Sequence, residues 1–164
     1  MECVIGIDPG ISGAIVVLRE DGSIAKAELC PTLPTGKGTK RDYDYHGMAR
    51  LLRPYSRMHC AIELVGPMPK QGVTSMFNFG KGWGAWIGMA AAYEMPLTFV
   101  RPQNWQKVML DGYPGGKATK ESAVRVAKNL WAENIMLVRK KDWGIADAAL
   151  IAEWLRLRRK GELQ

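Results

Sequence analysis

The stretch Cys3–Gly10, CVIGIDPG, determines how the rest of the chain is interpreted. Its first five residues are apolar or glycine, which is typical of a short strand buried on both faces. Pro9 and Gly10 then form a turn signal. Between the strand and the turn stands Asp8, so the first question is what a carboxylate does at the end of a buried strand.

The same criteria predict the elements that follow. Strands are predicted where short apolar runs are bounded by turn residues, at 4–8, 13–18, 23–29, 59–63 and 97–100. Helices are predicted at 45–52, 74–93, from 101 onward, after Thr119 and at about 144–159. The helix after Thr119 is predicted to bury one face, formed by Ala123, Val124, Ala127, Leu130 and Trp131. The segment 31–45 is predicted to be a mobile basic loop.

This order of elements predicts an α/β fold with a mixed sheet, in which an antiparallel meander is followed by parallel strands flanked by helices. The length of 164 residues fits a single domain spanning residues 1–164. The formal net charge of +7 favours a polyanionic partner such as nucleic acid. The hydrophobic fraction of 47% and the charged fraction of 24% exclude a disordered chain.

Cysteine usage and hydropathy bear on the compartment. Cys3, Cys30 and Cys60 are odd in number and lack C-x-x-C spacing, so they are predicted to be buried free thiols in a reducing compartment. Neither a signal peptide nor a membrane-spanning segment is predicted, and a membrane partner is not expected. The sequence therefore predicts a cytoplasmic protein.

Two further acids extend the question that Asp8 raises. Glu63 ends the strand 59–63, and Asp147 interrupts the apolar sequence of the last helix. Three acids in apolar surroundings repel one another unless cations neutralise them, and oxygen ligands of this kind suit Mg²⁺ or Mn²⁺. Two such ions could activate water and stabilise the leaving oxygen of a phosphodiester. Taken singly, the acids have simpler explanations, as an Asx turn, a solvent-facing strand end and an acid near the start of a helix.

With these three acids in this order, the sequence resembles a known family, the RuvC-like Holliday junction resolvases of the ribonuclease H-like superfamily. The segments 5–10 and 61–63 match the family strands that carry the first and second catalytic acids. The segment 75–84 is similar to the lead into the family's long central helix, and 145–152 is similar to its last helix, which supplies the final acid. The resemblance covers nearly the whole chain, and the sequence is more similar to phage-type and organelle-type members than to the housekeeping bacterial ones.

The resemblance implies a ribonuclease H-like fold and a metal-dependent endonuclease that resolves four-way DNA junctions by paired symmetric nicks. It implies a homodimer and two Mg²⁺ ions, or Mn²⁺ as a substitute, in each active site. The residues that it implies as catalytic are Asp8, Glu63, Asp147, Asp142, Lys107 and Lys120, of which the four acids would be metal ligands and the two lysines phosphate contacts.

The chain departs from the family pattern near its last acid. The family often carries an Asp or a His three residues before that acid, and here the position is Gly144. Asp142 is the nearest substitute, but five residues on a regular helix turn through about 500°. Asp142 therefore reaches the site only if it precedes the helix. After Glu63, where some members carry a stacking aromatic, Met68 is the only large apolar candidate for a wedge in the DNA, and a covered loop residue is the alternative.

Several alternatives stay open at this stage. The chain could be a junction-binding module without catalysis, or another ribonuclease H-like nuclease that acts on branched DNA. The glycines at 80, 84 and 88 give the long helix a smooth face that packs either on the sheet or on a second copy of the chain. Lys37, Lys40 and Arg41 form either a DNA clamp or an idle surface loop. An actin-like kinase is excluded, because that group needs two such domains around its nucleotide.

Overall fold

A computed structural model describes residues 3–36, 38–66, 72–110, 120–132 and 142–163. Its main sheet has five strands in the order β3-β2-β1-β6-β7. The bounds of these strands are β1 Cys3–Asp8, β2 Ala14–Arg19, β3 Ile24–Leu29, β6 His59–Glu63 and β7 Leu97–Val100. The first three strands pair antiparallel, whereas β1, β6 and β7 run parallel. The mixed sheet predicted from the sequence is thus confirmed.

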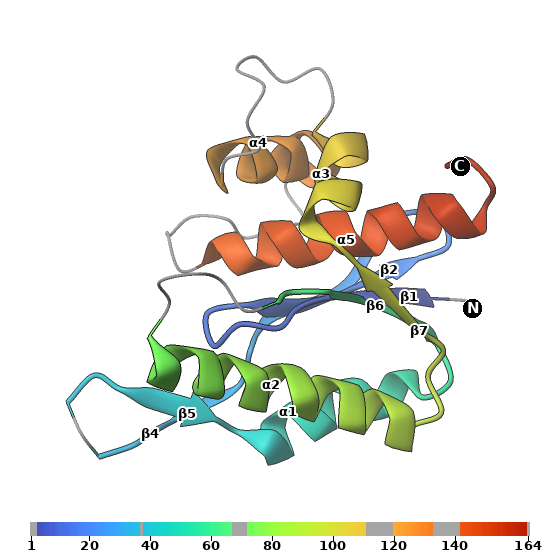
Figure 1. The fold of residues 1–164 in the computed structure, drawn as a ribbon. Coiled ribbons are helices and arrows are strands. Elements are labelled where there is room, and N and C mark those ends of the chain that lie inside the picture. Colours follow the sequence, from blue (N-terminus) through green and yellow to red (C-terminus); the bar gives the residue numbers. More distant parts are fainter. Residues whose placement is uncertain (1–2, 37, 67–71, 111–119, 133–141, 164) are drawn as a thin grey trace.

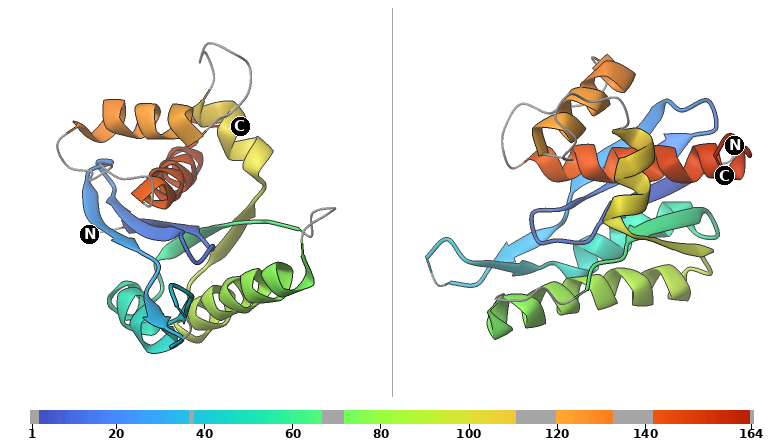
Figure 2. Two further views of the ribbon diagram at one scale, coloured as in Figure 1. Left: turned by 90° about the vertical axis from the view of Figure 1, so that its left-hand side faces the viewer. Right: turned by 45° about the horizontal axis from the view of Figure 1, so that its top comes forward.

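Helices cover both faces of the sheet (Figure 1). On one face, α5 (Trp143–Arg159) packs along β1 and β2, and α3 (Pro102–Met109) and α4 (Lys120–Trp131) pack on α5. On the other face lie α1 (Tyr45–Leu52) and α2 (Val73–Ala92), and a short 3₁₀ turn, Arg53–Tyr55, follows α1. Figure 2 shows the same layers from two further directions. The site candidates at the carboxyl ends of β1 and β6 therefore lie beside α5.

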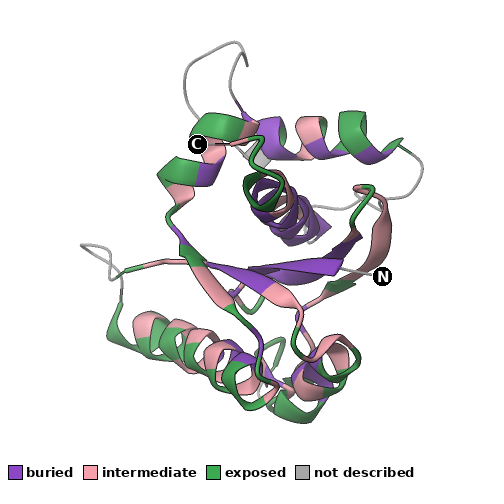
Figure 3. Cartoon of the chain, turned by 90° about the vertical axis from the view of Figure 1, so that its right-hand side faces the viewer, coloured by how far each residue is buried: buried purple, intermediate pink, exposed green. Residues whose placement is uncertain are grey.

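The alternation of side chains along β1 divides the core in two. Ile5 and Ile7 point towards α1 and α2, where they pack in one cluster with Met48 and Trp86. Val4 points to the opposite face, in the cluster around α5. Figure 3 shows buried positions concentrated on the central strands and on α5. Because β1 is buried on both faces, packing on both sides holds the strand that ends in Asp8.

One prediction about the fold is wrong. The segment predicted as a basic loop contains a second, two-stranded sheet, formed by β4 (Thr32–Pro34) and β5 (Arg41–Tyr43). Arg41 joins the strands, because its Nε donates to Thr32 Oγ1 at 2.6 Å and its Nη2 donates to the Thr32 carbonyl at 2.7 Å. Tyr43 is buried against α2, where a Cβ on Gly82 would overlap its ring. We call β4 and β5 together the β4–β5 ribbon.

The other predicted strands and helices agree with the structure, but one residue of a predicted core face does not. Leu130 was expected in the core face of α4 but is 50% exposed, because α5 covers the neighbouring Ala123 and Ala127 and not the far edge of that face. The three cysteines are buried and unpaired, as predicted. In the part of the chain that the structure describes, no helix combines the length and the apolar character needed to span a membrane. Thr119, Met68 and Lys37 lie outside the described residues.

Candidate active site

The strand register brings Asp8 and Glu63 to neighbouring positions. β1 and β6 are parallel, with Ile7 paired to Ile62, so the next residue of each strand is the acid. Ile7 and Ile62 both point into the core beneath α1 and α2. Because side chains alternate along a strand, the two carboxylates belong to the opposite face, which α5 covers. Both residues are half-buried.

Asp8 also shapes the turn that follows it. The Gly10 amide donates to Asp8 Oδ1 at 3.4 Å, a weak contact of the Asx type. The charge of Asp8 reaches Cys30, whose pKa is raised to about 12, first by burial of the thiol and then by the nearby carboxylate. Asp8 is therefore an Asx residue whose side chain also lies near the buried thiol of Cys30.

Two tryptophans bind Glu63. The indole Nε1 of Trp105, on α3, donates to the side-chain oxygen Oε1 of Glu63 at 2.8 Å. The indole Nε1 of Trp83, on α2, donates to the main-chain carbonyl of the same residue at 3.1 Å. Neither tryptophan was predicted as a site residue. The available signal was the position of Trp105 in the first turn of the helix that directly follows β7, and so beside the end of β6.

The start of α5 is packed against the turn between β1 and β2. A Cβ on Gly144 would lie 2.5 Å from the Ser12 carbonyl oxygen and 2.8 Å from Gly13 Cα, so no side chain fits there. This close approach explains why the chain has glycine at a position where the resembling family often has Asp or His. One helical turn later, Ala148 contacts the backbone of Gly6 in β1. Asp147 lies between these two contacts along α5, close to the strand that carries Asp8.

Asp142 occupies the N-cap position of α5, directly before its first helical residue. It therefore precedes the helix, as its spacing from Asp147 requires if both acids are to serve one site. Its residue exposure is only 3%, and its side chain does not cap the helix. The elements that carry the four acids thus meet where β1 and β6 end and α5 begins, a region that we call the corner.

The donors at this corner fit a divalent cation by their chemistry. All four are carboxylates, which are the ligands that Mg²⁺ and Mn²⁺ prefer. Within the described ranges, however, no three His, Cys, Asp or Glu side chains lie close enough to form a metal-binding cluster. The structure thus supplies suitable donors on neighbouring elements without gathering them into a closed cage.

Unlike the acids, the basic residues predicted for the site lie on α2, α3 and α4. Lys107 is exposed on α3, two residues after Trp105 and hence about 200° around the helix from the residue that touches Glu63. Lys120 is the first residue of α4, and its side chain is outside what the structure describes. Lys81 forms an ion pair with Asp42 of the β4–β5 ribbon at 2.9 Å. The fold does not bring Lys107 to Glu63 in the way that it brings Trp105.

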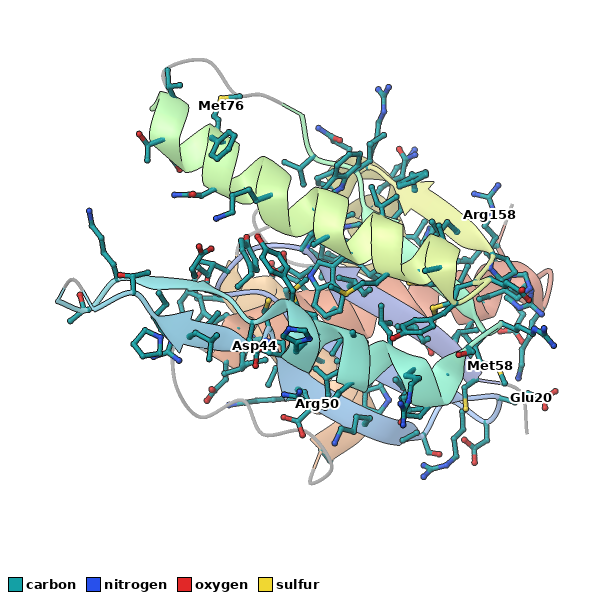
Figure 4. All side chains as sticks on the ribbon, turned by 90° about the horizontal axis from the view of Figure 1, so that it is seen from below. Glu20, Asp44, Arg50, Met58, Met76 and Arg158 are labelled. Carbon is teal, nitrogen blue, oxygen red and sulfur yellow. The ribbon has the colours of Figure 1, made fainter. Side chains whose placement is uncertain are left out.

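A groove of about 620 Å³ lies between the turn after Asp8, the β4–β5 ribbon and the first turns of α2, and none of the four acids lines it. Most of its lining residues are polar, and the full set is Gly10, Ile11, Ser12, Thr35, Lys40, Arg41, Asp42, Tyr43, Thr74, Ser75, Asn78 and Phe79. In Figure 4 the ribbon extends alongside the start of α2, near the labelled Met76. Two basic residues of the segment predicted as a loop thus lie on a wall of this groove.

Comparison with known proteins supports the fold. No protein-family model matches the sequence, and no curated protein is significantly similar to it. Among solved structures, RuvC of T. thermophilus in complex with a Holliday junction substrate aligns with a TM-score of 0.69 and 18% identity, covering 100% of this chain and 99% of that chain. Another structure of Thermus thermophilus RuvC aligns with a TM-score of 0.69 and 21% identity, covering 97% and 96%.

The yeast mitochondrial Holliday junction resolvase aligns with a TM-score of 0.56 and 18% identity, covering 97% of this chain and 80% of that chain. The chain therefore has the ribonuclease H-like fold of RuvC-like resolvases, as the sequence resemblance predicted. Since these identities lie between 18% and 21%, the likeness establishes the fold alone.

Proposed function

We propose that the protein is a metal-dependent endonuclease that resolves four-way DNA junctions by paired, symmetric cleavage. The observation that carries the proposal is the register of β1 and β6, which sets Asp8 and Glu63 side by side on the face covered by α5. A fold match over the whole chain to a resolvase solved with its junction substrate supports the same assignment. Asp147 and Asp142 complete the proposed set of acids.

The four acids would hold Mg²⁺, or Mn²⁺ in its place, with two ions in each active site. When bound, the ions supply an activated water and a counter-charge for the leaving oxygen. The chain supplies the geometry, because Asp8 and Glu63 sit at the ends of buried strands and Asp147 sits on a helix packed against one of them. Lys107 and Lys120 are proposed to contact neighbouring phosphates of the DNA.

The groove lined by the turn after Asp8 is proposed as a path for the DNA backbone. Lys40 and Arg41 line it together with hydroxyl and amide side chains of α2, and such groups bind phosphate oxygens without reading sequence. The net charge of +7 favours the same polyanionic partner. Binding carried by these contacts is expected to weaken steeply as salt rises, because counterions are released when phosphates are neutralised.

Symmetric cleavage requires two active sites, and we propose that a homodimer provides them through α2. On the outer face of this helix Val73 is 86% exposed and Phe77 is 69% exposed. A Cβ added at Gly84 or Gly88 would meet nothing within 4 Å in the chain. Replacing Gly84 by tryptophan is therefore expected to leave the protomer folded and to weaken dimerisation, which sedimentation velocity would measure. A monomer at micromolar concentration in the unmodified protein, both free and on a junction, would contradict this assembly.

One observation favours a second candidate, a junction-binding module without catalysis. The described acidic side chains do not form a closed cluster, and the position often held by Asp or His in the resembling family is Gly144. The two candidates make the same prediction for DNA binding and opposite predictions for cleavage. Only a cleavage assay separates them.

The test is cleavage of a four-way junction, a linear duplex and an RNA–DNA hybrid of the same sequence, with Mg²⁺ or with EDTA. The proposal predicts paired nicks in the junction, in Mg²⁺ only, and little cleavage of the other substrates. Glu63→Gln and Asp147→Asn are expected to abolish cleavage and to retain junction binding, because each removes a charge and preserves shape. Binding without any cleavage would establish the second candidate, and preference for the hybrid would indicate a different nuclease of the same fold.

A further inference from the structure

Glu63 accepts hydrogen bonds from two indole groups in different ways. Trp105 donates to a carboxylate oxygen at 2.8 Å, whereas Trp83 donates to the main-chain carbonyl at 3.1 Å. The two donors come from different helices, α3 and α2, on opposite faces of the sheet. Trp83 therefore fixes the end of the β6 backbone, and Trp105 fixes the side chain that extends from it.

Trp105 is held rigidly enough to orient a carboxylate. It is 1% exposed and belongs to the core cluster that includes Ala127, Leu110 and residues of α5. α3 begins with Pro102 shortly after β7, the strand paired to β6, so the indole is tied through the sheet to the acid that it contacts. A hydrogen bond from a neutral donor to a carboxylate is stronger than one to a neutral acceptor, and it restricts rotation of the carboxylate.

The need of a buried indole N–H for an acceptor explains the Trp83 contact, but it does not explain why Trp105 donates to a carboxylate. A buried indole N–H needs an acceptor, and a main-chain carbonyl satisfies that need, as Trp83 shows. Trp105 instead donates to the side chain of an acid at a strand end, beside the other acids of the proposed site. Hydrogen bonds that orient carboxylate ligands are a general requirement of metal sites, since a ligand that rotates freely binds its ion poorly.

We propose that Trp105 is a positioning residue, whose indole N–H sets the orientation in which the Glu63 carboxylate receives a divalent cation. This inference rests on the proposed function, because it assumes that Glu63 is a metal ligand. It assigns a role to a residue outside the acids and lysines already considered. It also explains why an aromatic side chain of the α3 core reaches the edge of the sheet.

The test compares two matched substitutions, Trp105→Phe and Trp83→Phe. Each removes one indole N–H from Glu63 and keeps an aromatic ring, but only the first affects the carboxylate. The readout is Mn²⁺ binding to the DNA-free protein by calorimetry, with the melting temperature in EDTA measured in parallel. Junction affinity in EDTA reports separately on the DNA surface.

We expect Trp105→Phe to weaken Mn²⁺ binding by about 10- to 100-fold, the usual effect of removing a group that orients a metal ligand. Trp83→Phe is expected to change it by less than about threefold, and both variants are expected to bind the junction within about twofold of the unmodified protein, because neither removes a phosphate contact. Benzothienylalanine at position 105 preserves the shape of tryptophan without the N–H. It is expected to reproduce the loss even if the phenylalanine variant folds poorly.

Unchanged Mn²⁺ binding in the benzothienylalanine protein would overturn the inference and leave the proposed function intact. Equal losses in Trp105→Phe and Trp83→Phe would overturn it too, since they would indicate a general loosening of β6. An unmodified protein that binds no Mn²⁺ at millimolar concentration would instead refute the metal-dependent function on which the inference rests. The three results are thus distinguishable.

Discussion

Replacing Gly6 by alanine is expected to push α5 away from the sheet and to separate the acids that the two elements carry. A Cβ at position 6 would lie 2.9 Å from the α-carbon of Ala152, and closer still to the Ala148 carbonyl oxygen and the Ala152 amide nitrogen. All three atoms belong to the backbone of α5, so no side chain can rotate to relieve the overlap. Asp8 lies two residues further along β1, and Asp147 directly precedes Ala148.

The size of the effect follows from these distances. Ordinary van der Waals separation begins at 3.4 Å, so the overlap with the α-carbon of Ala152 alone requires a withdrawal of 3.4 − 2.9 = 0.5 Å. The two closer atoms bring the required movement to about 1 Å, and a misplacement of that size costs roughly 100-fold in rate. Overpacking of a core costs about 1–3 kcal/mol, and the upper end applies where backbone atoms collide. For a chain of this length, about 3 kcal/mol lowers the melting temperature by about 6–12 °C.

The assays are thermal unfolding and single-turnover cleavage of a four-way junction in saturating Mg²⁺. The matched control is Gly88→Ala on α2, where a Cβ meets nothing within 4 Å. That change is expected to stabilise the helix by roughly 0.5–1 kcal/mol, and it is a control for thermal unfolding only, because Gly88 lies on the proposed dimer face. If Gly6→Ala melts within about 2 °C of the unmodified protein and cleaves at a normal rate, the close packing of α5 on β1 does not position the acids, and the reasoning is refuted.

Three further predictions concern single groups. Asp8→Asn is expected to abolish cleavage. Its affinity for the junction should stay within about twofold of that of the unmodified protein, because binding depends on lysine and arginine contacts. Measurable turnover in Mg²⁺ would exclude Asp8 as a metal ligand. The hydrogen bond from the Lys81 ammonium lowers the pKa of Asp42 below its usual 3.8. Their ion pair therefore stabilises the docking of the β4–β5 ribbon above that pH and is lost as the pH falls below the lowered pKa. Lys81→Met should return the pKa of Asp42 towards 3.8 in a carboxyl NMR titration, and an unchanged pKa would contradict the contact. Burial raises the pKa values of the Cys30 and Cys60 thiols, that of Cys30 to about 12. Neither thiol should therefore react with a thiol reagent at about pH 8 until urea unfolds the chain. Rapid labelling of the native protein would contradict their burial.

The strand-end acids were predictable because their signal is local. An apolar run that ends in a carboxylate is visible at Asp8 and again at Glu63, and parallel pairing of the two strands follows from their order in the chain. The apolar sequence around Asp147 identified the last helix in the same way. The sequence therefore determined which elements carry the acids, and the structure added the register that places Asp8 beside Glu63.

Features that depend on contacts between distant residues were not predictable. The β4–β5 ribbon is joined by Arg41 and Thr32 and docked by Tyr43 on Gly82, and none of these contacts has a local signature. Periodicity identified the apolar face of α4 without showing that Leu130 lies beyond the edge covered by α5. The contact between Trp105 and Glu63 was not predictable for the same reason, because the two residues are 42 positions apart in the chain.

We propose that the corner formed by β1, β6 and the start of α5 binds divalent cations, and anomalous diffraction from crystals soaked in Mn²⁺ tests this binding most directly. The account predicts anomalous density between the side chains of Asp8 and Glu63, within about 2.0–2.3 Å of their carboxylate oxygens, and its loss in Glu63→Gln. An empty corner in crystals that hold Mn²⁺ at other sites, or density that survives in Glu63→Gln, would contradict the account.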